Sequence, residues 1–517
     1  MKYPLGIQDF ESIRKNGFVY IDKTALIYKL VHEGQFYFLS RPRRFGKSLL
    51  VSTLQAYFQG KQELFDGLAM SQLEQEWKTI PVLHLDLNAE KYTTPEALTS
   101  ILNRHLSQWE EEYGRNPNED TLSGRFAGII RRAYEQSGER VAILVDEYDK
   151  PLLQAMGDKH LQEDYRATLK AFYGVEKSMG ACIRLAFFTG VTKFSKVSVF
   201  SDLNNLTDLT MNKCYATLCG ITEDEIRSCL DEEVGLMADE NDMTKEECYA
   251  KLNQNYDGYH FEVGTVGVYN PYSLLNALSN RAFKDYWFET GTPSYLIDLL
   301  KQYGYRLENL DKEEVTADIL GNIDTIDQNP IPLLYQSGYL TLGGYDKEFQ
   351  MYSMKFPNLE VERGFTRFLI PYYTVLKSNQ GQVFIANFVK DVRTGNVNQF
   401  MQRLESLFTA GDYQVMGDAE LYFQNAVWVI FKMMGFYTEV EHHTTNGRMD
   451  MLVKTRDYVY IIEFKLDRSA DEALRQIEEK QYAKPFEHDG RQIYKIGVSF
   501  SSTTRRMEEW KIAQGRD

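Results

Sequence analysis

Short apolar runs alternate with stretches of helical periodicity along the first two fifths of the chain. The continuous apolar runs 36–39, 141–145 and 185–188 are typical of strands that are buried on both faces of a parallel sheet. The segment 81–87 predicts a further strand, with alternation towards its end. Helical periodicity fills the segments between these strands, at 95–113, 122–137 and about 160–175. Strands that alternate with helices predict an α/β fold with a doubly wound parallel sheet.

The pattern changes at about residue 202 and again at about residue 405. Between Ile221 and Asp257 the period is helical and acids far outnumber bases, which predicts a small helical domain with a solvated acidic face. Residues 300–400 show no recognisable chemistry, and we expect a connecting or partner-binding role for them. Farther on, a helix at about Ala419–Met434 precedes three expected strands, at 437–442, 448–454 and 458–465.

The segment Arg41–Ser48 joins the first strand to an apolar helix. It ends in Gly-Lys-Ser, as a phosphate-binding loop does. Gly46 would let the backbone approach a phosphate, Lys47 would reach the β- and γ-phosphates of ATP, and the Ser48 hydroxyl would ligate Mg²⁺. The residues expected to contact the nucleotide here are Arg43, Arg44, Phe45, Gly46, Lys47, Ser48 and Leu49. The alternative interpretation is a basic surface loop that caps a helix.

Two acids end the apolar run 141–145. Because ligands bind at the carboxyl ends of parallel strands, Asp146 would hold Mg²⁺ through water and Glu147 would orient the attacking water. A polar residue after the strand 185–188 would lie beside the γ-phosphate, and Thr192 is our first choice, ahead of Thr189. The alternative is a buried strand that ends in a solvated acid pair.

Five short motifs resemble those of the AAA-ATPase-like family of bacterial proteins. They are Tyr20–Thr24, Arg41–Leu49, Leu144–Pro151, Tyr256–Tyr259 and Tyr269–Ser273. Arg41 stands where a phosphate loop usually has its first glycine, which adopts positive φ at little cost. In the resembled family Arg-Pro-Arg-Arg-Phe-Gly-Lys is the usual loop, so the resemblance makes Arg41 a family trait. Many members carry a C-terminal domain of the PD-(D/E)XK nuclease superfamily. The resemblance implies a P-loop ATPase domain at 1–215, a helical domain at 216–310, a connecting region at 311–404 and a restriction-endonuclease-like α/β domain at 405–517.

The two last expected strands form a hairpin in which carboxylates face each other. If Arg456–Asp457 is a two-residue turn, Asp450 lies opposite Glu463 and Arg448 lies opposite Lys465. Glu463 and Lys465 share a face because they are two residues apart. Two such carboxylates repel each other, and a divalent cation would offset that cost. Oxygen ligands alone favour Mg²⁺ or Mn²⁺, and the lysine could stabilise charge on a phosphoryl group.

This arrangement resembles the D…E-x-K signature of PD-(D/E)XK nucleases. The resemblance implies that Asp450, Glu463 and Lys465 are catalytic and that both acids bind metal. Glu420 stands where the superfamily often has an acid on its first helix, so it is a further candidate metal ligand. Three residues on the helix after Lys465 are expected to support the site: Gln476, Gln481 and Tyr482. The alternative is a surface hairpin with a ladder of Glu and Lys.

Composition narrows the setting. The chain has 517 residues and a net charge of −16, which argues against non-specific nucleic-acid binding by the whole surface. No apolar run reaches the length of a membrane span, and no signal region begins the sequence. The five cysteines are odd in number and contain no C-x-x-C pair, so we expect neither a disulfide framework nor a zinc cage. The simplest location is the cytoplasm.

These patterns predict an ATP-driven protein coupled to a metal-dependent nuclease that acts on DNA rather than RNA, in defence or in the handling of mobile DNA. The alternative is a non-catalytic ATP switch or scaffold whose C-terminal domain only binds nucleic acid or a protein. No arginine finger can be assigned, and Arg131, Arg132 and Arg184 are the candidates. A neighbour's arginine would complete the site if the protein forms a homo-oligomer.

Overall fold

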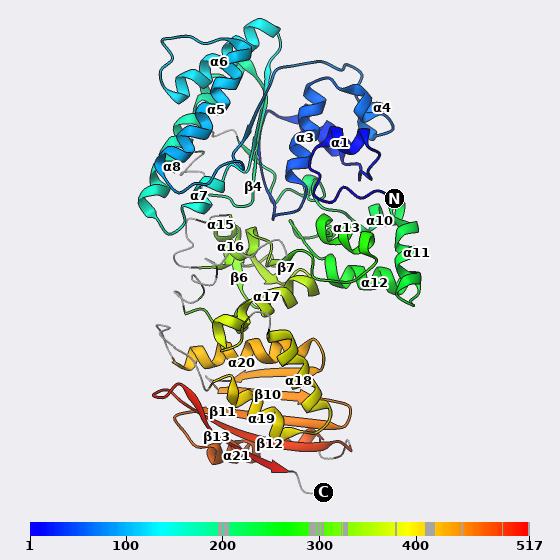
Figure 1. Cartoon of the computed structure of the whole chain (residues 1–517), viewed down its shortest axis with the longest axis vertical. Helices are drawn as coiled ribbons and strands as arrows, with labels where there is room; N and C mark the ends of the chain where they lie inside the picture. The colour runs from blue at the N-terminus through cyan, green and yellow to red at the C-terminus, as the bar shows by residue number, and fades with distance from the viewer. Residues whose placement is uncertain are drawn as a thin grey trace. The chain divides into compact units, whose positions relative to one another are not determined.

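The structure is a computed structural model whose contacts divide the chain into two compact units (Figure 1). One unit comprises Met1–Glu289 and Asp311–Glu360, and the other comprises Thr290–Leu310 and Val361–Asp517. The residues described are 1–194, 200, 206–288, 296, 300, 304–321, 323, 329–377, 380–408, 419–445, 448–486, 488 and 490–514, with the backbone alone at 419, 442–445, 448–450 and 514. The expected boundaries at 215, 310 and 404 stay a prediction.

A five-stranded sheet forms the centre of the first unit. Its order is β2-β3-β4-β1-β5, and all neighbouring strands are parallel. The strands are β1 (Phe36–Ser40), β2 (Val82–Asp86), β3 (Val141–Asp146), β4 (Ile183–Gly190) and β5 (Thr207–Asp208). The predicted parallel α/β fold is therefore confirmed. Strand β4 lies between β1 and β3, so the loop after β1 and the acids after β3 come from strands that are not neighbours.

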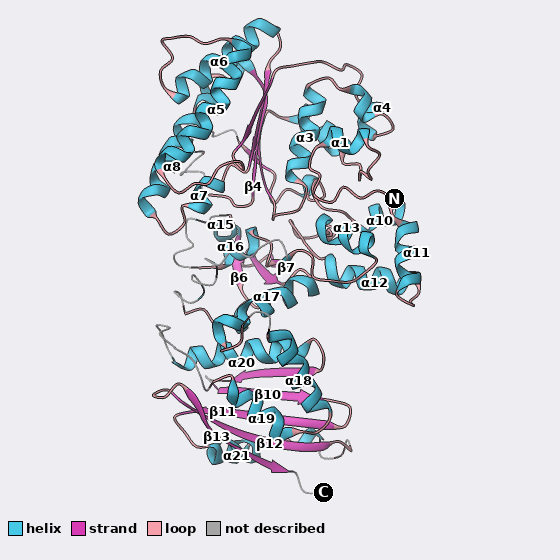
Figure 2. Cartoon of the chain, viewed as in Figure 1, coloured by secondary structure: helices cyan, strands magenta, loops and turns pink. Residues whose placement is uncertain are grey.

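Helices cover both faces of this sheet. Figure 2 shows α5, α6 and α8 on one face and α1, α3 and α4 on the other. These helices are α1 (Phe10–Lys15), α3 (Lys47–Phe58), α4 (Ala69–Leu73), α5 (Pro95–Tyr113), α6 (Leu122–Ser137) and α8 (Lys159–Tyr173), while α2 (Thr24–Glu33) packs on α4. The spans of α5 and α6 agree with those predicted, because their ends carry strong signals. Pro95 begins α5, Thr121 caps α6, and glycines with positive φ follow both helices at 114 and 138.

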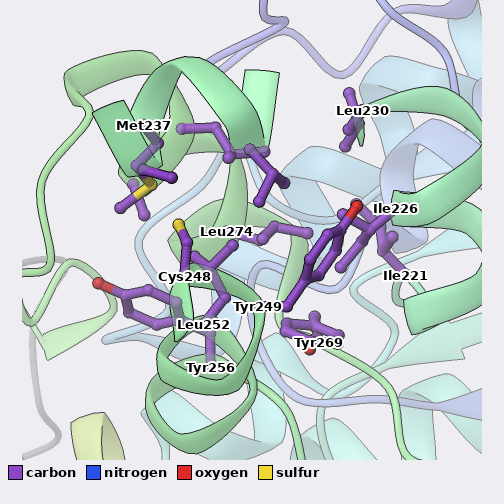
Figure 3. Close-up of a cluster of buried hydrophobic side chains, with 14 of the residues drawn as sticks. Ile221, Ile226, Leu230, Met237, Cys248, Tyr249, Leu252, Tyr256, Tyr269 and Leu274 are labelled. Atoms are coloured by element: carbon purple, nitrogen blue, oxygen red, sulfur yellow. The ribbon is translucent and has the colours of Figure 1, made fainter. Parts of the chain in front are cut away.

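The acidic middle region forms four helices around an apolar cluster. They are α10 (Glu223–Cys229), α11 (Asp231–Glu240), α12 (Lys245–Tyr256) and α13 (Pro271–Asn280). Thr222 and Thr244 each form a capping box with the glutamate three residues later, so part of the acidic excess serves helix starts. Figure 3 shows Met237, Cys248 and Leu252 pointing into the interior of the cluster. Apolar residues from 1–21 also pack there, among them Tyr3 and Ile21.

A second, mixed sheet forms the centre of the other unit, with the order β13-β12-β11-β10-β9. Its strands are β9 (Glu439–Thr445), β10 (Arg448–Lys454), β11 (Tyr458–Leu466), β12 (Gln492–Ser501) and β13 (Arg506–Gln514). Strands β11 and β12 are parallel and the other pairs are antiparallel. The described helices that pack around this sheet include α18 (Gly381–Arg393), α19 (Val397–Ser406), α20 (Ala419–Gly435) and α21 (Ala470–Glu479).

Strand β11 divides its side chains between two helical layers. The Tyr460 hydroxyl donates to the carbonyl of Val392 on α18 at 2.8 Å, and the Phe464 ring lies near Phe431 of α20. Val459 and Ile461 instead pack with Ile477 of α21. Since side chains alternate along a strand, Glu463 and Lys465 lie on the face that α21 covers. None of the described helices is long and apolar enough to cross a membrane.

A buried acid begins the helix α17 (Leu359–Tyr373). Glu360 is 1% exposed and accepts the backbone N–H of Trp287 at 2.7 Å. Burial raises the pKa of Glu360 to about 8, and the hydrogen bond from Trp287 only partly opposes that shift. The folded state therefore holds a proton near neutral pH that the unfolded chain releases.

We expect this proton to make the stability of the first unit depend on pH. Because the folded pKa lies above the ordinary value of 4.5, the contribution of Glu360 to stability is fully present below pH 4.5 and falls as pH rises towards 8, by up to about 1.4 kcal/mol per pH unit. The substitution Glu360→Gln keeps an acceptor for Trp287 and removes the titration. Thermal unfolding between pH 5.5 and 8.5 should show the variant gaining on the parent as pH rises. A constant difference across this range would contradict the assignment.

Candidate functional site

The phosphate-loop candidate is a tight turn between β1 and α3. Positive φ occurs at Arg44 (69°) and Gly46 (88°), and Gly46 immediately precedes the first turn of α3. The Lys47 side chain is 4% exposed, and its Nζ donates to the carbonyls of Arg41 and Pro42 at 3.1 and 3.2 Å. The ammonium group is therefore held over the loop by backbone oxygens, in the position where a bound anion would compete for it.

Arg41 replaces the first glycine of the usual loop with a buried anchor. Its guanidinium is 1% exposed and donates to the carbonyls of Ser40 and Thr210, both at 2.9 Å, and of Tyr215 at 3.3 Å. It also lies 3.8 Å from the centroid of the Phe261 ring. Burial lowers the pKa of Arg41. The loop thus needs no glycine at its start, because its left-handed residues come later.

Residues from the middle region hold the outer side of the loop. The Phe45 ring packs edge-on against Tyr259, with centroids 4.8 Å apart, and the Trp287 indole N–H donates to the carbonyl of Arg43 at 3.3 Å. The Arg44 guanidinium lies 4.9 Å from the Tyr272 ring. The motifs Tyr256–Tyr259 and Tyr269–Ser273 therefore contribute aromatic side chains, Tyr259 and Tyr272, that support this loop. The side chains of Arg43 and Arg44 remain exposed.

The two acids after β3 meet the loop. Asp146 is buried, and burial raises its pKa to about 6; the neighbouring Ser48 side chain opposes the rise and the charge of Glu147 adds to it. Glu147 has a positive φ of 53°, and its Oε1 lies 4.0 Å from Lys47 Nζ. A non-glycine residue in this conformation is strained, and such strain gathers at functional sites. The structure therefore brings Lys47 and Glu147 together, and the roles of the loop and the acids towards nucleotide and Mg²⁺ stay a prediction.

The predicted γ-phosphate contacts have other partners. The Thr189 hydroxyl donates to the carbonyl of Leu39 at 2.9 Å, and the Thr192 hydroxyl donates to Asp149 at 2.6 Å. Both threonines are buried. A direct contact between Thr192 and nucleotide stays a prediction.

The three arginine-finger candidates lie outside these contacts. Arg132 pairs with Glu119 at 2.9 Å, Arg131 is exposed on α6, and Arg184 donates to the carbonyl of Val31 at 2.6 Å. Arg184 stands at the beginning of β4, at the amino ends of the strands, whereas the loop and the acids follow the carboxyl ends. None of the three is thereby assigned.

An apolar cavity of about 90 Å³ adjoins the loop. Gly46 and Leu49 line it from the loop and α3, Tyr20 and Ile21 line it from the N-terminal segment, and Leu275 lines it from α13. The residues around it are mostly apolar, so it suits a flat, weakly polar group attached to a phosphate chain.

In the second unit the predicted hairpin register is confirmed. Asp450 pairs with Glu463 across β10 and β11, and Thr455 and Tyr458 close the turn. The pairs between β10 and β11 end at Asp450 and Glu463, so the pairing of Arg448 with Lys465 stays a prediction; on the other edge of β10, Arg448 pairs with Thr445 of β9. The side chains of Arg448 and Asp450 lie outside the described part of the structure.

Glu463 and Lys465 form a buried pair with one free oxygen. Lys465 Nζ donates to Glu463 Oε1 at 2.5 Å and to Gln476 Oε1 on α21 at 2.6 Å. Glu463 is 0% exposed, and its Oε2 has no hydrogen-bond partner among the described residues. A buried carboxylate oxygen without a donor is costly, and a divalent cation would satisfy it. This residue therefore fits a metal site that the opposite residue Asp450 would complete.

The supporting residues are only partly brought together. Gln476 touches Lys465, while Gln481 accepts from Lys484 at 3.3 Å and the Tyr482 N–H donates to the carbonyl of Ile477. Among the residues with described side chains, no group of three or more His, Cys, Asp or Glu could hold a metal ion. Asp450 is not among those residues.

Glu420 lies on α20, on the other helical layer from α21. It lines a cavity of about 50 Å³ together with Gln424 and Lys465, and Gln424 donates to Glu420 at 3.1 Å. No described contact joins Glu420 to Glu463. A metal-binding role for Glu420 stays a prediction.

Sequence reasoning missed several residues of these sites. It did not assign roles to Asp149, Trp287 or Gln424. Asp149 carried a signal, since it is a third acid within the motif Leu144–Pro151, directly after an apolar run. Trp287 and Gln424 stand in unremarkable sequence, and their roles depend on contacts with distant segments.

Comparison with known proteins agrees with the two predicted domain types. Residues 4–200 match a family model described as a predicted AAA-ATPase, and residues 418–510 match a model of the PD-(D/E)XK nuclease superfamily. A protein of Azotobacter chroococcum mcd 1, described as an uncharacterized protein in the vnfD 5′ region, is 34% identical over 527 residues. The match covers 98% of this chain and 97% of that protein. No solved structure matches the chain.

Arg41 and Arg43 offer a matched test of the buried anchor. Arg41→Met should lower the free energy of unfolding by about 3 kcal/mol, because three backbone carbonyls lose their donor in a buried place. The same change at the exposed Arg43 should cost less than about 0.5 kcal/mol. Denaturant unfolding of the two variants measures the difference. Equal losses would mean that the Arg41 contacts contribute nothing particular to the fold.

Proposed function

We infer the function of this chain from its family, since it belongs to the predicted AAA-ATPases whose C-terminal part is a PD-(D/E)XK nuclease superfamily domain. We propose that the first unit binds and hydrolyses ATP and that the second cleaves nucleic acid. The observation that carries the first proposal is the meeting of the loop with the acids, where Lys47 Nζ lies 4.0 Å from Glu147 Oε1.

In the ATP site each residue has a distinct task. The backbone N–H groups at the start of α3 and the Lys47 ammonium bind the phosphates, and Lys47 exchanges its carbonyl partners for phosphate oxygens. Glu147 holds the attacking water and accepts its proton. Ser48 and Asp146 are the residues that would hold Mg²⁺, which neutralises developing phosphate charge when bound. The cavity beside Gly46 and Leu49 takes the base.

In the nuclease site the buried pair supplies the chemistry. Asp450 and Glu463 would hold Mg²⁺ or Mn²⁺, which polarises the phosphodiester and lowers the pKa of water when bound. Gln476 fixes the Lys465 ammonium on the face that carries Glu463, so that the lysine can stabilise charge on the phosphate. This proposal is supported by Glu463 Oε2, which has no hydrogen-bond partner among the residues that the structure describes.

Charge distribution favours the second unit as the nucleic-acid contact. Residues 290–310 and 361–517 contain equal numbers of acidic and basic side chains, so the whole net charge of −16 belongs to the first unit. A polyanion is therefore repelled less by the second unit. We propose DNA as the substrate, a cytoplasmic setting, and a role in defence or in the handling of mobile DNA.

The ATP proposal predicts different losses at two positions. Lys47→Ala should abolish ATP binding measured by calorimetry, because it removes the cation that holds the phosphates. Glu147→Gln should retain ATP binding and lower hydrolysis about 10²-fold or more, because it removes the base. Both variants should unfold thermally as the parent does without nucleotide. If Lys47→Ala binds ATP as tightly as the parent, the loop assignment is wrong.

The metal-binding part of the nuclease proposal is tested on the full chain without ATP. Mn²⁺ or Mg²⁺ should raise the unfolding temperature, since a cation that binds only the folded state stabilises it. Asp450→Asn should reduce that gain and abolish cleavage, whereas Asp457→Asn in the exposed turn of the same hairpin should do neither. Lys465→Ala should abolish cleavage and leave most of the metal-induced stabilisation. The cleavage assay uses a panel of DNA and RNA, with and without ATP and Mn²⁺.

Unchanged cleavage by Asp450→Asn would overturn the nuclease assignment. A metal-induced gain without cleavage of any nucleic acid in the panel would indicate a domain that binds metal but is not a nuclease.

A further inference from the structure

Asp149 is a third buried acid beside the ATP site. It is 0% exposed and precedes the short helix α7 (Lys150–Gln154). Its carboxylate accepts the N–H of Val191 at 3.1 Å and both the N–H and the hydroxyl of Thr192 at 2.6 Å. A Cβ added at Gly190 would lie 2.3 Å from Asp149 Oδ1. The backbone after β4 is therefore shaped around this carboxylate.

The segment Gly190–Thr192 is also bonded, on its other side, to the end of β1 and the first residue of the phosphate loop. The Ser40 hydroxyl donates to the carbonyl of Val191 at 2.6 Å, and the Arg41 N–H donates to the carbonyl of Gly190 at 3.2 Å. The segment Gly190–Thr192 thus touches the first residues of the loop on one side and Asp149 on the other.

The Tyr148 side chain also bonds the turn that carries Asp146 and Glu147 to the segment after β4. Its hydroxyl donates to the carbonyl of Thr192 at 3.0 Å and accepts the N–H of Phe194 at 3.1 Å. Tyr148 and Asp149 follow Asp146 and Glu147 directly in the chain. The turn that carries the acids is therefore fixed to the end of β4 by two consecutive side chains.

We propose that Asp149 is the positioning residue that sets the distance between Lys47 and Glu147. Strands β1 and β3 are not neighbours, so the geometry between the loop and the acids is set through the end of β4, which Asp149 clamps. A displacement of about 1 Å between reacting groups can cost about 10²-fold in rate, while phosphate binding by the loop tolerates it. This inference rests on the proposed ATPase activity.

The electrostatic setting agrees with this role. Burial raises the pKa of Asp149 to about 6, and the charge of Glu147 contributes to the rise. The carboxylate is kept in a buried place by four donated hydrogen bonds, two of them from the Val191 N–H, which is shared between its oxygens. Burying this carboxylate costs free energy, and perturbed acids of this kind cluster at functional sites. Its place beside the reacting groups agrees with a positioning role.

The test separates the rate of hydrolysis from ATP binding. Steady-state hydrolysis and calorimetry with ATP are compared for the parent, Asp149→Ala, Thr192→Val, Thr192→Ser and the double variant Asp149→Ala/Thr192→Val. Asp149→Ala should lower kcat at least 10-fold and change the Kd for ATP less than about threefold. Thr192→Val should lower kcat, Thr192→Ser should retain more activity, and the double variant should be no slower than Asp149→Ala, because both changes break one contact.

A matched control separates this effect from a general loss of stability. Glu110 is a buried acid on α5 that pairs with Arg125 at 2.8 Å, away from the loop and the acids. Glu110→Ala should lower the unfolding temperature and leave kcat and KM as in the parent.

The outcomes of these assays distinguish a failure of the inference about Asp149 from a failure of the proposed ATPase activity. A folded Asp149→Ala variant that hydrolyses ATP at the parental kcat overturns the inference while the ATPase assignment stands. Additive losses in the double variant would also overturn it, since they indicate that Thr192 acts independently, as a direct phosphate contact would. If Asp149→Ala does not fold, a parental kcat in Thr192→Val overturns it. A parent that binds no ATP contradicts the proposed function itself, and the inference with it.

Discussion

The buried guanidinium of Arg41 is the interaction on which the first unit most depends. A fully buried cation without a carboxylate partner is expensive, and here carbonyl dipoles from three separate places compensate it: Ser40, Thr210 and Tyr215. The same side chain faces the Phe261 ring. One residue thus joins the end of β1, the segment after β5 and the segment that carries Phe261. At the position where the usual phosphate loop has a flexible glycine, the contacts of Arg41 make this loop rigid.

Much of this fold follows from periodicity and helix-end signals. The runs 141–145 and 185–188 became strands buried on both faces, and the spans of α5 and α6 agreed because Pro95, Thr121 and two glycines mark their ends. The order of the strands did not follow from the pattern. Neighbours in a parallel sheet are joined by long crossovers, so nothing local to β1 indicates that β4 lies next to it.

The candidate sites show the same division between local and distant information. The pairing of Asp450 with Glu463 could be predicted, because a two-residue turn fixes the register of both strands. The contacts of Lys465 with Gln476 and of Trp287 with Arg43 join segments that the register of one hairpin does not relate. The sequence suggested Thr192 for a phosphate contact because it follows a strand. The direction of its hydroxyl, however, depends on Asp149, which follows a different strand.

The two sites handle buried carboxylates in opposite ways, which suits their proposed chemistry. Burial holds the pKa of Asp146 near 6, because the neighbouring Ser48 and Lys47 side chains only partly offset the cost of burying its charge. At Glu463 one oxygen has the full charge of Lys465 beside it, while the other has no donor among the described residues. A lysine that satisfied both oxygens would close the site to a cation. Because Gln476 takes a second donor of Lys465, the ammonium is held to one oxygen and the other stays available.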